Sequence, residues 1–189
     1  MLAREFFERK TDLVARDLLG KILVRKISDT LLKGKIVETE AYFGENDPAS
    51  RAYEGMKNYN KEMWGDPGKI FVYNVHKYWM FNVVAHLKNE VGAVLIRAVQ
   101  PIDGIEVMMR NRRVNDIKDL TNGPGKLTEA FRIDKSFNGK FLGINTGIWI
   151  EDCDEREFFN IGKSFRIGVK KDLRKKLRFY ISGNEFVSR

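Results

Sequence analysis

Short runs rich in apolar residues recur along the chain and predict β-strands. The runs lie at 21–27, 32–43, 69–75, 79–85, 92–99, 147–151, 164–169 and 177–182. Apolar residues at helical spacing predict helices over about 11–19, 102–113 and 126–131, and Thr11 is the expected cap of the first. Strands and helices that do not alternate regularly favour an α+β fold over a doubly wound one.

A long polar segment, 44–68, interrupts this pattern. It holds Gly44, Pro48, Gly55, Gly65, Pro67 and Gly68, so it predicts a loop with short helical turns. Loops of this length are uncommon in a compact domain and often form binding surfaces. No stretch rich in Pro, Gly or Ser marks a boundary, and the 189 residues are enough for one core, so we expect a single domain over 1–189.

The charge balance narrows the classes of function. The chain has 34 Lys and Arg residues against 26 Asp and Glu, a formal charge of +8 that suits a polyanionic partner. No apolar run approaches the roughly 18 residues of a membrane span, and the first residues show no signal-peptide pattern. The single cysteine, Cys153, excludes an internal disulfide framework. The chain has only two histidines, His76 and His86, so no Cys/His zinc site is expected.

The segment 35–42, Lys-Ile-Val-Glu-Thr-Glu-Ala-Tyr, carries the most informative chemistry. Because strand side chains alternate between faces, Glu38, Glu40 and Tyr42 share one face. A carboxylate beside an aromatic ring at the end of a strand suits a general base above a flat substrate. The simpler interpretation is a solvent-exposed strand face, and the segment alone leaves both interpretations open.

Other polar residues stand in apolar surroundings or at turns. Arg97 lies within an apolar strand, where a charge needs a partner, so it predicts either a structural ion pair or a site arginine. The turn at 76–78 combines aromatic and basic side chains, as minor-groove wedges do. Lys126 follows Gly-Pro-Gly, which fails the pattern of a phosphate-binding loop but could hold one phosphate. Further candidate phosphate contacts are Arg110, Arg112, Arg113, Lys170, Lys171, Arg174, Lys175 and Lys176.

Several segments occur in an order typical of one enzyme family. They are 19–21, 36–42, 47–50, 67–73, 81–82, 95–101, 122–127, 166–169 and 177–183. Together they resemble the alkyladenine (3-methyladenine) DNA glycosylase family, and the Glu-Thr-Glu-Ala-Tyr and Gly-Pro-x-Lys-Leu segments make the match specific. The resemblance implies a curved, largely antiparallel sheet with flanking helices and a protruding β-hairpin that inserts into DNA.

The resemblance also implies a reaction. Glu40 would be the general base that activates water, and Arg97 and the backbone carbonyl of Ile167 would help to hold that water. The sugar carbon cannot be reached inside stacked DNA, so the damaged purine must be rotated out, at a cost of roughly a few kcal/mol. No lysine occupies position 40, so no Schiff-base lyase step is expected.

The remaining site residues are assigned in the same way. Tyr42 and Tyr73 would stack on the extruded base, and Asn82 would crowd the exocyclic amino group of guanine. The implied DNA contacts are His76, Lys77, Tyr78 and Lys126. The implied partner is double-stranded DNA containing damaged purines, bound by a monomer inside a DNA-containing compartment of the cell, without cofactor, metal or membrane.

Two departures from the family pattern matter. Arg51 occupies the position, eleven residues after Glu40, where the family usually has a pocket histidine. If its guanidinium stays in the pocket, it can stack on a neutral base and repel a cationic one, which predicts a preference for hypoxanthine or another neutral lesion. If it points at a phosphate, no preference follows. The hairpin is also one residue short, so the wedge falls near His76, with Tyr78 as the other candidate.

Two other classes of function remain open on sequence grounds. A non-catalytic DNA- or RNA-binding module of the same fold would keep the basic face and the hairpin but would not need Glu40. A small-molecule transferase or hydrolase would use Glu40 without duplex affinity, whereas phosphate-contacting proteins lose affinity steeply as salt rises.

Overall fold

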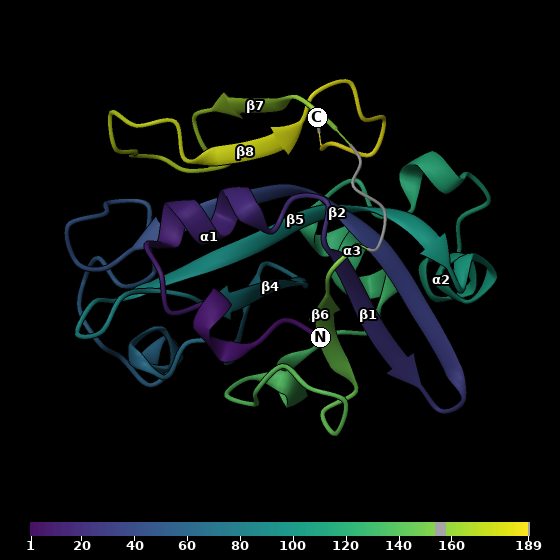
Figure 1. The fold of residues 1–189 in the computed structure, drawn as a ribbon, viewed down its shortest axis with the longest axis horizontal. Helices are drawn as coiled ribbons and strands as arrows, with labels where there is room; N and C mark the ends of the chain where they lie inside the picture. Colours follow the sequence, from purple (N-terminus) through teal and green to yellow (C-terminus); the bar gives the residue numbers. More distant parts are fainter. Residues whose placement is uncertain (154–157, 189) are drawn as a thin grey trace.

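One curved antiparallel sheet organises the chain, and its long strands cross the centre of Figure 1. The computed structural model describes residues 1–153 and 158–188. In these ranges the strand order is β3-β4-β5-β2-β1-β6, with β8 paired to β2 and β7 paired to β8. The strands are β1 (Ile22–Ile27), β2 (Thr30–Phe43), β3 (Ile70–Val75), β4 (Tyr78–Val84), β5 (Gly92–Asp103), β6 (Ile148–Glu151), β7 (Ile161–Ser164) and β8 (Arg178–Ile181).

Helices flank this sheet. Within the described ranges the α-helices are α1 (Thr11–Asp17), α2 (Ile105–Arg112) and α3 (Pro124–Ala130), and the 3-10 helices are η1 (Arg4–Phe6), η2 (Lys61–Trp64), η3 (Ile117–Asp119) and η4 (Lys135–Phe137). Helix α1 lies against β2 and β5 and buries Val14 and Ala15 completely, and Leu18 at its C-terminal cap is also fully buried. Helix α3 contacts α2, β4 and β5. The predicted α+β fold with an antiparallel sheet is therefore confirmed.

Side chains of the central strands alternate between two packed clusters, as a period of two requires. On β5, Val94 and Ile96 belong to the main core, whereas Leu95 belongs to a second, smaller cluster. The smaller cluster also holds Tyr42 from β2 and Phe71 from β3. The same strands thus supply the main core on one face and a second apolar layer on the other.

Strand β2 lies in the middle of the sheet, and its two edges pair with different strands. One edge pairs with β5, with register shifts around Ile36 and Glu38. The other edge pairs with β1 as far as Lys35 and then with β8 from Glu38 to Glu40. Bulges of this kind bend a strand and redirect its side chains. The change of partner therefore falls where the two carboxylates lie.

Two predicted helix starts are wrong in detail. Thr11 does not cap α1, because its hydroxyl donates to the backbone oxygen of Ala85 at 2.9 Å, and Lys10 makes no side-chain cap hydrogen bond. The helix expected from residue 102 begins at Ile105 instead. Strand β5 continues to residue 103, and Gly104 then takes φ +71, a left-handed conformation that redirects the chain into the helix.

The strand predicted at 164–169 is also wrong. Strand β7 ends at Ser164, and the chain from Phe165 onward forms a loop. The side chain of Arg166 turns inward to buried carboxylates, and Gly168 takes φ +74. The positive φ of Gly168 is incompatible with an extended strand, and the ion pairs of Arg166 anchor the segment as a loop.

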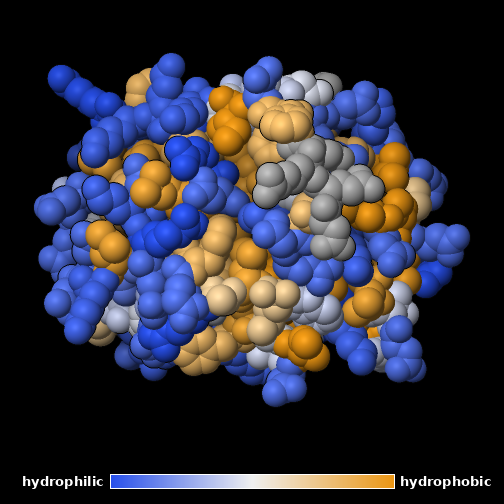
Figure 2. Space-filling view, in the orientation of Figure 1, coloured by the Kyte–Doolittle hydropathy of each residue, from blue (hydrophilic) through white to orange (hydrophobic). Residues whose placement is uncertain are grey.

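The surface carries the positive charge that the composition predicts. Figure 2 shows hydrophilic side chains over most of the face seen in Figure 1, with hydrophobic side chains in patches between them. The loop before β8 exposes Lys170, Lys171, Arg174, Lys175 and Lys176. No helix in the described part of the chain is long and apolar enough to cross a membrane.

Candidate active site

Glu40 lies towards the end of β2 as a fully buried carboxylate. Its Oε1 accepts the backbone N–H of Ile167 at 2.8 Å, and its Oε2 accepts the hydroxyl of Tyr42 at 2.7 Å. Arg97 on β5 donates Nη1 to the same Oε2 at 3.2 Å. The Glu40 side chain has no exposed surface, so the interpretation of this segment as a solvent-exposed strand face is wrong. The structure brings together the three residues predicted around the reacting water, although Ile167 meets Glu40 through its N–H.

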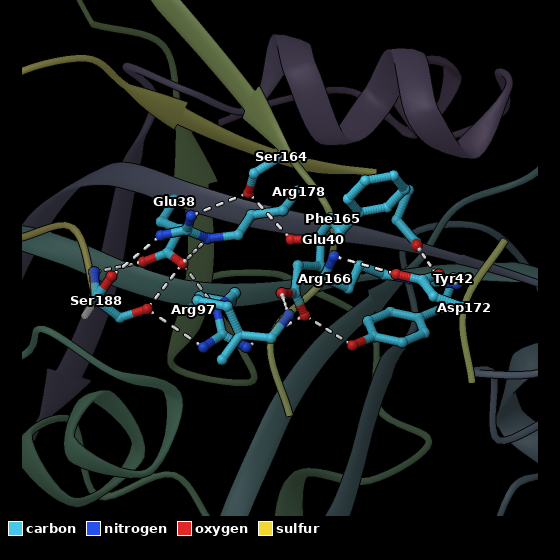
Figure 3. Close-up of polar contacts among 12 residues, drawn as sticks. Glu38, Glu40, Tyr42, Arg97, Ser164, Phe165, Arg166, Asp172, Arg178 and Ser188 are labelled. Carbon is cyan, nitrogen blue, oxygen red and sulfur yellow. Dashed lines mark hydrogen bonds and ion pairs between the residues drawn. The ribbon is translucent and has the colours of Figure 1, made fainter. Parts of the chain in front are cut away.

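Glu38 is a second buried carboxylate, and more positive charge surrounds it than surrounds Glu40 (Figure 3). Arg97 Nε and Arg178 Nε donate to its Oε1 at 2.8 and 2.7 Å. Ser188 donates its hydroxyl to Oε1 at 2.8 Å and its backbone N–H to Oε2 at 2.6 Å. Burial alone would lower the pKa of Arg97, but Glu40 and Glu38 beside it raise that pKa above its ordinary value. Arg97 therefore forms a structural ion pair with Glu38 and also contacts Glu40, the candidate base.

A buried arginine, Arg166, holds the loop after β7 against β2. Its Nη1 and Nη2 donate to the two carboxylate oxygens of Asp47 at 2.7 and 2.6 Å, and its Nε donates to Asp172 at 3.0 Å. Two-point pairing of a guanidinium with a carboxylate fixes geometry as well as adding energy. This clamp sets the position of the Ile167 N–H that meets Glu40.

Tyr42 connects this clamp to the candidate base. The guanidinium carbon of Arg166 lies 4.5 Å from the centroid of the Tyr42 ring, and the Tyr42 hydroxyl donates to Glu40. Burial first, and then the negative charge of Glu40, raise the pKa of Tyr42 well above its ordinary value. The phenol therefore stays protonated at neutral pH and keeps donating to the carboxylate.

A cavity of about 660 Å³ opens beside these groups. Volumes of roughly 300–1,000 Å³ are typical of sites for small organic groups. Tyr42, Arg51, Tyr73, Arg97 and Ile167 line this cavity together, and Val75, Met80, Leu95 and Val169 add apolar surface. Residues predicted as stacking walls and residues predicted around the water thus share one cavity.

Two positions were considered for the Arg51 guanidinium, inside the pocket or towards a phosphate, and the structure places it in the pocket wall. Its guanidinium carbon lies 4.7 Å from the centroid of the Tyr73 ring, and both residues line the cavity. On the same strand as Tyr73, Phe71 places its ring centroid 5.1 Å away. Burial raises the pKa of Tyr73, and the positive charge of Arg51 opposes that rise. The guanidinium therefore belongs to the cavity wall.

Strands β3 and β4 form the predicted hairpin, and only His76 and Lys77 join them. His76 has φ +52, which two-residue hairpin turns require at their first central position. Both tip residues are exposed. Tyr78 is half-buried at the base, where a Cβ atom on Gly125 would stand 2.8 Å from its Cγ. His76, at the exposed tip, is therefore more accessible than Tyr78.

Two other predicted site residues, Asn82 and Lys126, form hydrogen bonds or ion pairs with neighbouring groups of the protein. Asn82 is buried outside the cavity lining, and its Nδ2 donates to the backbone oxygens of Phe71 and Met80, each at 3.1 Å. Lys126 forms an ion pair with Asp119 at the start of α3. Exclusion of guanine by Asn82 and phosphate contact by Lys126 stay predictions.

Sequence reasoning missed the groups that hold the two carboxylates in place. Ser188, Arg178 and the Arg166–Asp47 pair were not among the predicted site residues. Arg166 stands between two apolar residues, as Arg97 does, and that signal could have identified it. In residues 1–153 and 158–188, no group of three or more His, Cys, Asp or Glu side chains is arranged to hold a metal ion.

Comparisons with known proteins agree on one family. A family model described as methylpurine-DNA glycosylase (MPG) matches residues 5–185. Similar proteins named as 3-methyladenine DNA glycosylases include one from Chlorobium phaeobacteroides, 44% identical over 191 residues that cover 100% of this chain and 97% of that protein. Others come from Aeropyrum pernix, 40% identical with 100% and 93% covered, and Clostridium perfringens, 43% identical with 100% and 98% covered. The chain belongs to the methylpurine-DNA glycosylase family.

Proposed function

We propose that this chain is a base-excision-repair DNA glycosylase that rotates a damaged purine out of double-stranded DNA and hydrolyses its N-glycosidic bond. Its substrates are N-alkylated adenine or guanine, hypoxanthine or ethenoadenine. It acts as a single-domain monomer, without cofactor or metal, in a compartment that contains DNA. Membership of the methylpurine-DNA glycosylase family and the names of its relatives support the repair of alkylated bases.

The observation that carries this proposal is a buried carboxylate held against a cavity large enough for a base. A carboxylate offers about four lone-pair directions. Tyr42, Arg97 and Ile167 occupy three of those of Glu40, and all three residues line the cavity. The fourth direction receives no donor from the described residues, and a water molecule bound there would let Glu40 act as a general base towards a group in the cavity.

The reaction uses a water molecule as the nucleophile and the Glu40 carboxylate as its base. The water oxygen bonds to C1′ of the sugar while the bond from C1′ to the purine nitrogen breaks. Glu40 takes the proton from the water, and the bonding electron pair leaves with the base. A positioned general base contributes roughly a hundredfold to ten-thousandfold. A cationic alkylated purine leaves as a neutral molecule, whereas a neutral lesion gains from protonation as it leaves.

The surface around the cavity supports binding of a duplex. The β3–β4 hairpin projects His76 and Lys77, which suit insertion where the extruded base leaves a gap. Lys170 and Lys171 line the cavity mouth from the loop after β7, and both are exposed. Cations at these positions suit contacts with phosphates on either side of the lesion.

The test is base release from defined duplexes. Duplexes carrying hypoxanthine, ethenoadenine or a methylated purine are incubated with the protein, and abasic sites are scored by alkaline cleavage. We expect release by the unchanged chain, loss of release in Glu40→Gln with duplex binding retained, and normal release in Glu90→Gln. Glu90 is an exposed carboxylate outside the site, so its replacement controls for the change in net charge.

Each alternative function gives a different outcome. A non-catalytic nucleic-acid-binding module would bind duplexes with wild-type affinity after Glu40→Gln and would release no base in either form. An enzyme acting on small molecules would show no salt-dependent affinity for a duplex. Either result would refute the proposed function.

A further inference from the structure

The chain fixes the backbone at Arg51 while it leaves the side chain to the cavity. The amide of Asn60, a fully buried residue, donates to the backbone oxygen of Arg51 at 2.7 Å and to that of Gly55 at 3.0 Å. The Asn60 side-chain oxygen accepts the N–H of Lys57 at 2.6 Å. One asparagine therefore ties this turn together from inside, and the position from which Arg51 projects is set.

The Tyr73 side chain holds the Arg51 guanidinium. It lies 4.7 Å from the Tyr73 ring centroid, and among residues 1–153 and 158–188 no carboxylate forms an ion pair with it. The other cavity arginine differs, because Arg97 is paired with Glu38 and Glu40. Arg51 thus brings a positive charge to the cavity wall that no neighbouring carboxylate neutralises.

The cavity lining as a whole carries positive charge and no negative charge. Its ionised residues in the described chain are Arg51, Arg97, Lys170 and Lys171, and no Asp or Glu lines it. Glu40 lies behind this lining with no exposed surface, and its charge is already shared with Arg97. Between unit charges a few ångströms apart, repulsion strengthens as water is displaced. A flat group that fills the cavity displaces that water.

From this geometry we infer that Arg51 is a specificity-determining residue that makes the cavity favour neutral damaged purines over cationic, ring-alkylated ones. The inference rests on the proposed function and names its substrate class. A planar guanidinium stacks well on a neutral aromatic base. The same guanidinium repels a purine that carries a positive charge. The Tyr73 ring keeps Arg51 at the wall where the base must stack.

The experiment compares two bases that differ in charge. Single-turnover release of hypoxanthine, which is neutral, and of 7-methylguanine, which is cationic, is measured on duplexes of the same sequence. The variants are Arg51→Gln and, as a matched control, Arg110→Gln, which removes an exposed arginine of α2 outside the cavity. Arg51 is itself exposed, so its replacement leaves the core intact, and a circular dichroism spectrum checks the fold.

We expect Arg51→Gln to lower the ratio of hypoxanthine release to 7-methylguanine release at least tenfold, while Arg110→Gln leaves that ratio unchanged. Release of both bases with a ratio that Arg51→Gln does not alter would overturn the inference and leave the proposed function standing. Release of neither base by the unchanged chain would refute the proposed function and the inference together.

Discussion

Replacing Glu38 by glutamine tests whether the two carboxylates of β2 have different tasks. Glu38 receives Arg97, Arg178 and both donors of Ser188. A glutamine can keep one oxygen at the Oε1 position, but its NH₂ group then faces the Ser188 N–H, which donates at 2.6 Å in the native chain. The variant thus loses the negative charge and also sets two donors against each other.

The magnitude follows from burial. The Glu38 side chain is 0% exposed, and those of Arg97 and Arg178 are 8% and 11% exposed. Breaking a buried ion pair by removing one partner costs about 3–5 kcal/mol. Arg97 keeps Glu40 in Glu38→Gln, so we expect the lower end, about 3 kcal/mol. For a chain of this size that lowers the melting temperature by about 6–12 °C.

Glu40→Gln is the matched control, because it makes the same chemical change two positions along the strand. The NH₂ group of this glutamine would also face a donor, such as the Ile167 N–H, but Glu40 has only one charged donor, at 3.2 Å, where Glu38 has two, and Arg97 stays paired with Glu38. We therefore expect a loss of only about 1–2 kcal/mol in the free energy of unfolding. Thermal melts and urea titrations measure both variants, and base release is assayed below their melting temperatures.

The expected pattern is a crossed one. Glu38→Gln should be the less stable variant and still release base, whereas Glu40→Gln should be the more stable and release none. Equal melting temperatures for the two variants, or base release that survives in Glu40→Gln, would refute the assignment of separate structural and chemical tasks.

Other features give further expectations. Gly125→Ala should lower stability by about 1–3 kcal/mol, since its Cβ would stand 2.8 Å from Tyr78 Cγ, and Gly143→Ala, with nothing within 4 Å, is the control in the same melts. Because the pKa of Tyr42 is raised by burial, its contribution to stability is fully present below about pH 10 and is lost as pH rises towards the raised pKa. An ultraviolet difference titration of wild type against Tyr42→Phe should therefore place this phenol's ionisation well above pH 10, and an ionisation at or below pH 10 would contradict it. If Lys171 contacts a phosphate, Lys171→Gln should reduce the slope of log affinity against log salt by about 1, and an unchanged slope would exclude that contact.

The sequence predicted most of the sheet because local patterns encode it. The apolar run 92–99 identified β5, and the strand pattern of 32–43 identified β2 and placed Glu38, Glu40 and Tyr42 on one face. Arg97 was recognisable because a charge inside an apolar strand needs a partner. These inferences need only neighbouring residues, so they hold without knowledge of the fold.

The rest could not be read locally because it depends on distant partners. The apolar rhythm of 164–169 suggested a strand, but the pairing of Arg166 with Asp47, far earlier in the chain, makes this segment a loop. Thr11 matched a helix cap, yet a carbonyl 74 positions away accepts its hydroxyl. Nothing near Ser188 in the sequence indicates that it meets Glu38.

The change of pairing partner along β2 has a consequence for the order in which the site forms during synthesis. The carboxylates and Arg97 are present once just over half of the chain has emerged from the ribosome, but the Ile167 N–H and the Ser188 donors follow 127 and 150 positions after the carboxylates that they meet. Contacts so distant in sequence form late in folding. A partly synthesised chain therefore holds the acidic pair without several of the groups that orient it, and the site is complete only when the segments around Ile167, Arg178 and Ser188 dock.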